Sequence, residues 1–301
     1  MKAIILAAGL GTRLKGLTEK RPKALMPIVN KPIIARNIDY LKSFGVNEIA
    51  VNAHHHSGHI IDYFNNCGPF DVEMDVRVEE HILGTGGGIK NFSDFWGKEA
   101  FIVINVDILT DINLEKAYQY HINSGNMVTM ILHDYEQFNQ VVVKDSQVID
   151  ISHKKSPERL AFTGIHVLDP MILSHIPASG YSDIIDCYNK LIRSGAAIGA
   201  YVAKNHYWRD IGTLESYIIA NREFLAFENK SFAVGPDSSI APSVRFKDWA
   251  AVGERAVIED GVEIERSILW EEITVKKGVR IVDSVVTSSK EINQDLINEI
   301  S

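Results

Sequence analysis

The chain has 301 residues, 46% of them hydrophobic, and a formal net charge of −8. This length predicts about two domains, the negative charge argues against a nucleic-acid-binding protein with a dominant basic face, and no apolar run approaches the roughly 20 residues that cross a bilayer. The two cysteines, Cys67 and Cys187, are too few and too isolated for a disulfide framework or a zinc site, so we expect a reducing, cytoplasmic compartment.

The first predicted element is a short buried strand, residues 3–8, which runs into a glycine loop. A short apolar run bounded by glycines is typical of a buried strand. Gly9 and Gly11 remove side chains where backbone N–H groups must approach a ligand closely. Arg13 and Lys23 add positive charge beside those N–H groups. The segment therefore predicts a site for the polyphosphate of a nucleotide.

Two common phosphate-binding loops do not fit this segment. Gly11 and Gly16 have the glycine spacing of a Walker loop, but Leu17 and Thr18 follow where Lys and Ser/Thr are required. A dinucleotide fingerprint needs a third glycine at the position of Leu14. The loop belongs to neither class.

Strand and helix patterns alternate over the first two-thirds of the chain. Apolar residues with a period near 3.6 predict helices over residues 32–44, 57–65, 113–124, 183–194 and 213–227. Further strands are predicted over residues 48–52, 72–78, 101–106, 127–132, 140–143 and 198–201. This alternation predicts an α/β fold with a Rossmann-like, mostly parallel sheet. Ligands of such sheets lie beyond the carboxyl ends of the strands, where the glycine loop and Asp107 fall.

From about residue 231 the pattern changes to a six-residue repeat. The recurring apolar positions are Val234, Ile240, Phe246, Val252, Ile258, Ile264 and Trp270. This spacing is typical of hexapeptide repeats that wind a parallel, left-handed β-helix. We therefore predict an α/β domain over residues 1–229, a β-helix over 230–288 and a polar, frayed tail over 289–301.

The N-terminal segment resembles the signature of the sugar-1-phosphate nucleotidyltransferases, also called nucleotide-sugar pyrophosphorylases. Their pattern is L-A-A-G-x-G-T-R-L, then P-K-x-L-x-P and N-K-P. This chain departs from it at Gly16 and Ala24, where the family often has proline, and neither position supplies a charge or a donor. The resemblance covers nearly the whole chain, and with its β-helix the chain is similar to mannose-1-phosphate guanylyltransferases. The Gly-Thr-Gly-Gly-Gly stretch at 84–88 also resembles N-acetylmuramate-1-phosphate uridylyltransferases.

The resemblance implies roles for individual residues. The expected nucleotide contacts are Leu6, Ala8, Gly9, Gly11, Thr12, Arg13, Lys23, Glu79, Gly84 and Thr85. Among these, Arg13 and Lys23 are expected to act catalytically by neutralising the triphosphate. Asp107 ends an apolar strand and Asp210 precedes Ile-Gly-Thr, which matches the two metal aspartates of the family. Carboxylates with substrate phosphates are typical ligands of Mg²⁺, which is the expected cofactor.

The residue expected to contact the base is Glu79. It lies five residues before Gly84, at a position where the family often has a Gln or Glu that contacts the base. A carboxylate only accepts hydrogen bonds, so it matches the N1–H and N2–H₂ donors of guanine, although it could also accept from N3–H of uracil. The alternative is that Glu79 and Glu80 are solvated surface residues.

The sugar side resembles the family less closely. Gly164 lies in a Phe-Thr-Gly-Ile segment similar to one that lines the sugar pocket, and Lys154 or Lys155 is expected to reach the sugar phosphate, with Lys155 preferred. Phe-Asn-Gln at 138–140 stands where many members have an aromatic residue and a glycine, so the identity of the sugar stays open.

The implied reaction joins a sugar 1-phosphate to a nucleoside triphosphate and releases pyrophosphate, with positioning and charge stabilisation as the main catalytic effects. Another NDP-sugar synthase of the family is one alternative. A catalytically silent regulatory subunit is a second, against which the presence of Arg13, Lys23, Asp107 and Asp210 argues. We expect small-molecule partners, no nucleic acid or membrane, and a homo-oligomer formed through the β-helix.

Overall fold

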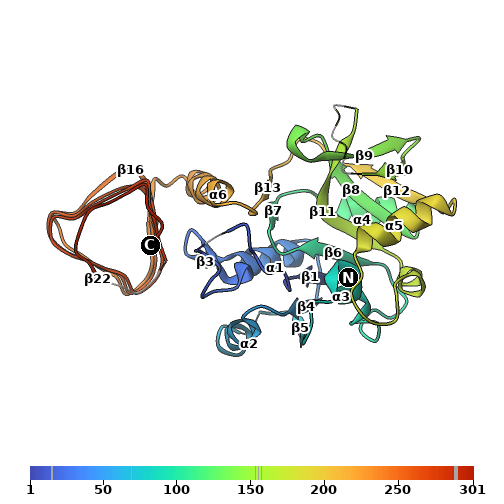
Figure 1. Cartoon of the computed structure of the whole chain (residues 1–301), viewed down its shortest axis with the longest axis horizontal. Helices are drawn as coiled ribbons and strands as arrows, with labels where there is room; N and C mark the ends of the chain where they lie inside the picture. Colours follow the sequence, from blue (N-terminus) through green and yellow to red (C-terminus); the bar gives the residue numbers. More distant parts are fainter. Residues whose placement is uncertain (15, 69, 153, 155, 157, 288–290) are drawn as a thin grey trace. The chain divides into compact units, whose positions relative to one another are not determined.

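The computed structural model describes residues 1–14, 16–68, 70–152, 154, 156, 158–287 and 291–301, and their contacts divide the chain into two compact units (Figure 1). The first unit comprises Met1–Leu10, Pro22–Ala24 and Ile34–Asp210; the second, here called the coil unit, comprises Gly11–Arg21, Leu25–Ile33 and Ile211–Ser301. This division differs from the predicted boundary near residue 229, because most of the N-terminal signature groups with the C-terminal part of the chain.

The described residues of the first unit form a nine-stranded sheet. Its strands are β1 (Lys2–Leu6), β4 (Glu48–Ala53), β5 (Glu73–Val78), β6 (Phe101–Asn105), β8 (Val128–His133), β9 (Asn139–Lys144), β10 (Gln147–Ile151), β11 (Leu160–Leu168) and β12 (Ile198–Val202). Their order across the sheet is β5-β4-β1-β6-β11-β8-β12-β10-β9. β5, β4, β1 and β6 run parallel to one another, and β8 runs parallel to β12.

The sheet as a whole is mixed, so the prediction of a mostly parallel sheet is right only for part of it. β11 lies antiparallel between β6 and β8, and β9 and β10 form an antiparallel hairpin. The hairpin turn places Asp145 and Ser146 at φ values of 50° and 61°, as the two-residue turns that fit strand twist require. Between β8 and β11, short connections replace the helices that parallel strands need.

The five predicted helices all form, with ends shifted by at most one residue. They are α1 (Ile33–Ser43), α2 (Ser57–Asn66), α4 (Leu114–Ser124), α5 (Ile184–Arg193) and α6 (Leu214–Phe227). Asn113 caps α4 by accepting from Lys116 N at 2.9 Å, and Asp183 caps α5 by accepting from Ile185 N at 2.8 Å, which satisfies N–H groups that have no partner within the helix.

The strands β10 and β11 of the sheet were not predicted, and neither were several short elements. The short elements are α3 (Gly84–Lys90), η1 (Lys23–Leu25), β2 (Pro27–Ile28), β3 (Lys31–Pro32), β7 (Ile108–Thr110), η2 (Glu136–Phe138), η3 (Pro170–His175) and β13 (Trp208–Asp210). Among the described residues, no helix combines the length and the apolar character that crossing a bilayer requires.

One face of the sheet carries an apolar core of the first unit. Ile4, Phe101 and Met130 point into it from the strands, and Ile89 of α3 and Tyr188 of α5 close it. Each of these side chains is completely buried. Burying a large aliphatic or aromatic side chain is worth about 1.5–3 kcal/mol, so this core fixes α3 and α5 against the sheet.

Three histidines, His121, His133 and His166, are almost completely buried in the first unit. Burial lowers all three pKa values, that of His133 to about 4 and that of His166 to about 3. The folded chain therefore holds them neutral, whereas unfolding restores a pKa of about 6.5. Their contribution to stability is complete above that pH and is lost as the pH falls from there toward the folded pKa values.

Acidification to about pH 5 should thus lower the free energy of unfolding by about 1–2 kcal/mol for each of His133 and His166. Urea unfolding at about pH 7.5 and about pH 5 measures this difference. His166→Gln should show a smaller difference than the parent chain, and the exposed His59→Gln should leave it unchanged. An equal pH dependence in all three proteins would contradict the assignment.

The C-terminal part of the coil unit consists of stacked parallel strands. One sheet contains β14 (Phe232–Val234), β16 (Arg245–Val252), β18 (Glu263–Leu269), β20 (Arg280–Val282) and β23 (Leu296–Ile297), and β21 (Val285–Val286) also pairs with β18. A second sheet contains β15 (Ser239–Ile240), β17 (Val257–Ile258), β19 (Thr274–Val275) and β22 (Glu291–Ile292). Ser239 pairs with Val257, 18 positions later, and Val257 pairs with Thr274, 17 positions later. Partner residues on successive parallel strands of the stack are thus 17 or 18 positions apart.

The described part of the predicted frayed tail continues these coils. Ile292 pairs with Val275, and Leu296 pairs with Ile281, and the side chains of Ile292 and Leu296 are buried. The sequence concealed this coil because polar residues of its outer surface separate the few apolar ones. The ordered strands therefore extend beyond the predicted end at residue 288.

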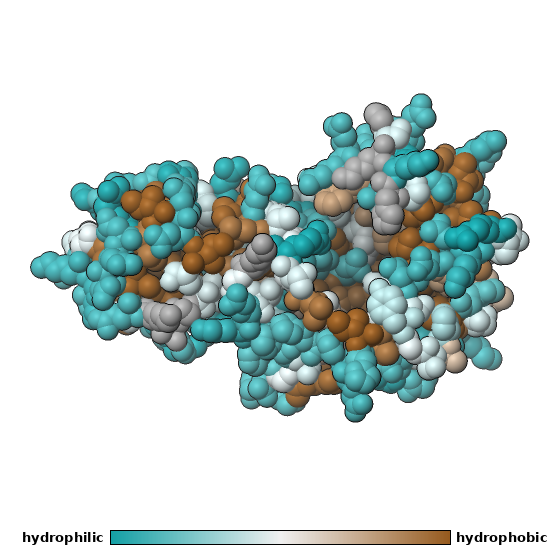
Figure 2. Space-filling model, in the orientation of Figure 1, coloured by the Kyte–Doolittle hydropathy of each residue, from teal (hydrophilic) through white to brown (hydrophobic). Residues whose placement is uncertain are grey.

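The surface drawn in Figure 2 is mostly polar, with apolar patches between the polar residues. On the coils, the exposed large apolar residues are Phe232, Val234, Val257, Ile297 and Ile300. Phe232 and Val234 belong to the first strand of the stack, and Ile297 and Ile300 to the last coil. Apolar groups are therefore exposed at both ends of the stack.

Candidate active site

Two of the predicted site residues, Lys23 and Asp107, form an ion pair in the first unit. Lys23 Nζ lies 2.6 Å from Asp107 Oδ2. Lys23 begins η1, and Asp107 lies between the end of β6 and the start of β7. The fold thus brings together two residues 84 positions apart, at the carboxyl end of a parallel strand, where ligands of such sheets bind.

The second predicted metal ligand, Asp210, lies on a strand next to Asp107. β13 pairs antiparallel with β7, and this register places Asp210 opposite Ile108, the residue that follows Asp107. The pairing is extended by Tyr207, whose N–H donates to Asp111 Oδ1 at 2.7 Å. Both aspartates are therefore fixed on neighbouring backbone segments.

The carboxylates of Asp107 and Asp210 are the candidate metal ligands. No group of three or more His, Cys, Asp or Glu side chains within the described ranges could hold a metal ion. Mg²⁺ does not need such a cage, because it commonly binds one or two carboxylates together with substrate phosphates and water. Asp107 and Asp210 fit that pattern.

The end of β1 supplies the first part of the glycine loop. Ala7 N donates to Asn52 Oδ1 at 2.7 Å, and Val106 N donates to Leu6 O at 3.1 Å, so neighbouring strands fix the chain up to this point. No described atom lies within 4 Å of the position that a Cβ would take at Gly9. Internal packing therefore does not explain why this residue is a glycine. The space beside Gly9, which with Ala8 is predicted to contact the nucleotide, is open.

The rest of the glycine loop belongs to the coil unit. Gly11 has a φ of 66°, and a Cβ there would lie 2.9 Å from Thr18 Cγ2, so no other residue fits this turn without strain. Thr18 Oγ1 donates to Gly11 O at 3.1 Å, and Leu14 is buried. Thr12 and Arg13 are exposed between these fixed points. The turn therefore leaves the side chain of Arg13 exposed.

Glu79 is 4% exposed, so the alternative of a solvated surface residue is wrong for it, although Glu80 is exposed. Its Oε1 accepts from Asn52 Nδ2 at 2.8 Å, and its Oε2 accepts from Leu83 N at 2.9 Å. Glu79 therefore holds the segment before α3 in place. Asn52 links it to the end of β1, a structural role that its position at the end of an apolar strand could have signalled.

The glycines at 84–88 form most of α3 instead of an open loop. A Cβ at Gly86 would lie 2.9 Å from Ser182 Oγ, and one at Gly88 would lie 2.6 Å from Asn52 Nδ2. The protein's own packing thus explains these glycines. Gly84 has a φ of 73°, and Thr85 Oγ1 accepts from Ile184 N at 2.9 Å, which ties the start of α3 to the start of α5.

On the sugar side, Gly164 lies in β11 with a φ of 76°. A Cβ there would lie 2.9 Å from Ile108 Cγ1 and 3.0 Å from Asn105 Nδ2, so Gly164 packs against the two residues that flank the turn holding Asp107. Lys154 is exposed. The prediction for Lys155 lies outside the described residues.

A known protein family matches most of this chain. The model of the family described as "Nucleotidyl transferase" matches residues 2–226. The chain belongs to the nucleotidyl transferase family. The resemblance predicted from the glycine loop and the two aspartate segments is therefore confirmed.

The relatives of this nucleotidyltransferase are named for different bases. It is 28% identical to UTP–glucose-1-phosphate uridylyltransferase of Synechocystis over 95% of this chain and 87% of the relative. It is 27% identical to mannose-1-phosphate guanylyltransferase 1 of Arabidopsis thaliana over 96% of this chain and 85% of the relative. Both alignments cover the coils as well as the sheet.

Solved structures resemble about three-quarters of the chain. HddC from Yersinia pseudotuberculosis, complexed with GMP-PN, has 27% identity and a TM-score of 0.65, and the match covers 74% of this chain and 99% of HddC. A UDP-glucose pyrophosphorylase complexed with UDP-glucose, at 20% identity and a TM-score of 0.64, shares the fold.

An aromatic cluster beyond the carboxyl end of β8 was not predicted. Trp208 lies at its centre, with ring centroids of His133, Tyr135 and Phe138 at 4.6, 5.2 and 5.8 Å. Trp208 Nε1 donates to Thr163 O at 2.9 Å, next to Gly164. The cluster therefore joins the strand of Asp210 to the predicted sugar side, and the Trp-Arg-Asp run was its only signal in the sequence.

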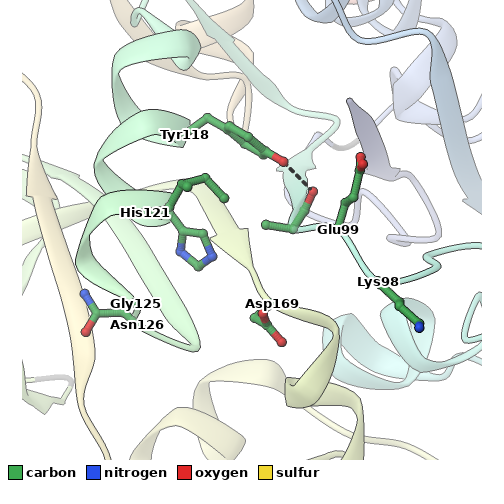
Figure 3. Close-up of a pocket in the computed structure, with 9 residues that line it drawn as sticks. Lys98, Glu99, Tyr118, His121, Gly125, Asn126 and Asp169 are labelled. Atoms are coloured by element: carbon green, nitrogen blue, oxygen red, sulfur yellow. Dashed lines mark hydrogen bonds between the residues drawn. The ribbon is translucent and has the colours of Figure 1, made fainter.

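A separate pocket of about 440 Å³ lies at the amino ends of β6 and β8 (Figure 3). His121 and Asp169 point into it, and Tyr118 Oη donates to Ala100 O at 3.0 Å along one wall. Ligands of α/β sheets bind at the carboxyl ends of strands. The pocket is therefore at the wrong edge of the sheet to be the nucleotide site.

Proposed function

We propose that this nucleotidyltransferase transfers a nucleoside monophosphate from a nucleoside triphosphate to a sugar 1-phosphate, giving an NDP-sugar and pyrophosphate. The observation that carries the proposal is the Lys23–Asp107 pair with Asp210 on the adjoining strand. A cation and two carboxylates at the carboxyl end of a strand can bind a triphosphate and a divalent cation together.

In the proposed reaction, a phosphate oxygen of the sugar 1-phosphate attacks the α-phosphorus of the triphosphate. The bond from that phosphorus to the bridging oxygen breaks, and pyrophosphate leaves with the electron pair. Lys23 has three donors, so it can keep its bond to Asp107 and also bind a phosphate oxygen. Arg13 would neutralise charge that develops on the α-phosphate. Asp107 and Asp210 would hold Mg²⁺, which supplies further charge neutralisation on the phosphate oxygens.

For the base, we propose guanine, with the chain acting as a mannose-1-phosphate guanylyltransferase-like enzyme. Glu79 is an acceptor whose carboxylate oxygens retain lone pairs beyond the bonds to Asn52 and Leu83. Gly84 and Thr85 would also contact the nucleotide on the side of the base. Gly164 and Lys155 would contact the sugar phosphate. The uridylyltransferase-like function remains the second candidate, because the relatives include enzymes named for each base.

Pyrophosphate release from a grid of the four common triphosphates and several sugar 1-phosphates tests this function. The highest kcat/KM is expected for GTP with mannose 1-phosphate. A preference for UTP would move the assignment to the second candidate. Release with no pair, in a folded chain supplied with Mg²⁺, would favour the catalytically silent regulatory subunit.

We also propose that the stacked strands form a left-handed β-helix of hexapeptide repeats that supports a homo-oligomer. Phe232 and Ile297 are exposed apolar residues of its first and last coils, and exposed apolar groups that cluster are typical of interfaces. Phe232→Glu and Ile297→Glu should each reduce the oligomer size measured by light scattering. The exposed polar substitution Lys247→Glu is the control, and a parent chain that is monomeric would contradict the proposal.

A further inference from the structure

Arg21, at the end of the glycine loop, is held by two residues of the coils. Its Nη1 donates to Glu271 Oε2 at 3.1 Å, and its Nη2 donates to Glu271 Oε1. The guanidinium also lies over the ring of Trp270, 4.4 Å from the centroid. Two parallel bonds to one carboxylate and an aromatic face fix a guanidinium in both position and plane.

This contact is partly shielded from water. The side chains of Arg21 and Glu271 are 25% and 29% exposed, and Trp270 is buried. Burial by itself raises the pKa of the Glu271 carboxyl, but the Arg21 guanidinium, a backbone hydrogen bond and Arg255 together lower the pKa below its usual value. Glu271 is therefore charged at neutral pH, and removing either partner of the pair leaves a poorly solvated charge.

The same coil residues also reach the second signature segment. Trp270 Nε1 donates to Tyr217 Oη at 2.8 Å, and Tyr217 Oη donates to Pro27 O at 2.8 Å. Asn221, also on α6, accepts from Val29 N at 2.8 Å. Buried hydrogen bonds thus connect the coils through α6 to the Pro-Lys-x-Leu-x-Pro segment, while Arg21 connects them to the glycine loop.

We propose that Arg21, Trp270 and Glu271 form a clamp through which the coils hold the glycine loop in its working conformation. The inference rests on the proposed function, because it makes Arg21 and Glu271 positioning residues for the catalytic residue Arg13. Gly11 and Thr18 fix one part of the loop internally, and the clamp fixes its end. The coils then contribute to turnover without supplying a group to the reacting phosphates.

The test compares Glu271→Gln with Glu272→Gln. Glu272 is the next residue along the same coil, but it is exposed and pairs with Arg255 on the outer surface. Hydrogen exchange of peptides within residues 9–22 reports loop order without any substrate, and kcat and KM report positioning. Glu271→Gln should accelerate loop exchange and lower kcat/KM by about tenfold, mainly in kcat, because small displacements of a positioned group are costly to the reaction. Glu272→Gln should stay within about twofold of the parent, as expected for an exposed pair.

Arg21→Ala and Arg21→Lys complete the design. Arg21→Ala should match Glu271→Gln, and Arg21→Lys should recover part of the loss because it keeps the charge but not the paired bonds. If Arg21→Ala lowers kcat while Glu271→Gln leaves both kcat and exchange unchanged, Arg21 acts on the substrate directly and the clamp is overturned. Unchanged loop exchange in both variants overturns it too. If no substrate pair reacts with the parent chain, the proposed function fails, and loop exchange alone decides the clamp.

Discussion

Replacing Asp107 by asparagine should lower kcat by about two orders of magnitude or more, the effect expected when one charge-stabilising group of a reaction is lost. Asp107 is the partner of Lys23 at 2.6 Å, so the substitution removes a proposed metal ligand and also leaves the lysine without its carboxylate. Asp210→Asn should have an effect of similar size, because the β13–β7 register places it beside Asp107. Pyrophosphate release over a range of Mg²⁺ concentrations measures both variants.

The matched control is Asp111→Asn. Asp111 is exposed and follows β7 directly, and its Oδ1 accepts from Tyr207 N, which an asparagine oxygen can also do. This variant should retain parental kcat. Full turnover of the parent chain in excess chelator would sink the proposed metal role, as would parental kcat in Asp107→Asn.

Arg13→Ala should also lower kcat strongly, by about 10²-fold, with a smaller rise in KM for the triphosphate. Arg13 is exposed on a loop whose shape depends on Gly11, Leu14 and Thr18, so its removal should leave the free energy of unfolding nearly unchanged. Steady-state kinetics combined with urea unfolding separates the two quantities.

Lys20→Ala is the control for Arg13, since Lys20 is an exposed cation of the same loop without a proposed role. It should change neither kcat nor KM by more than about twofold. If Arg13→Ala raises KM alone, Arg13 binds substrate and transition state equally and the catalytic assignment is wrong.

The elements with strong periodicity could be predicted from the sequence. The apolar spacing of residues 183–194 gave α5 to within one residue at each end, and the six-residue repeat gave the coils. α3 could not be predicted, because glycine disfavours helices by about 1 kcal/mol per residue. Tertiary packing decides there, since Ser182 and Asn52 leave no room for a Cβ at Gly86 and Gly88.

The candidate site, too, could be predicted from the sequence only in part. That the glycine-loop motif and Asp107 share one edge of the sheet could be predicted, whereas the direct ion pair of Lys23 with Asp107 could not. The burial of Glu79 could not be seen, because nothing in its local sequence shows that Asn52 and Leu83 satisfy its oxygens. The Arg21–Glu271 contact joins residues 250 positions apart, a separation at which no local pattern carries information.

That separation has a consequence for how the protein is made. A ribosome adds about 5–20 residues per second, so the N-terminal loop with Arg13 is complete many seconds before Glu271 has been synthesised. The contacts of Arg21 with Trp270 and Glu271 cannot form until nearly the whole chain has left the ribosome. The first of the proposed catalytic motifs to be translated is thus among the last to receive its final partners, and nascent chains that stop short of Trp270 lack them.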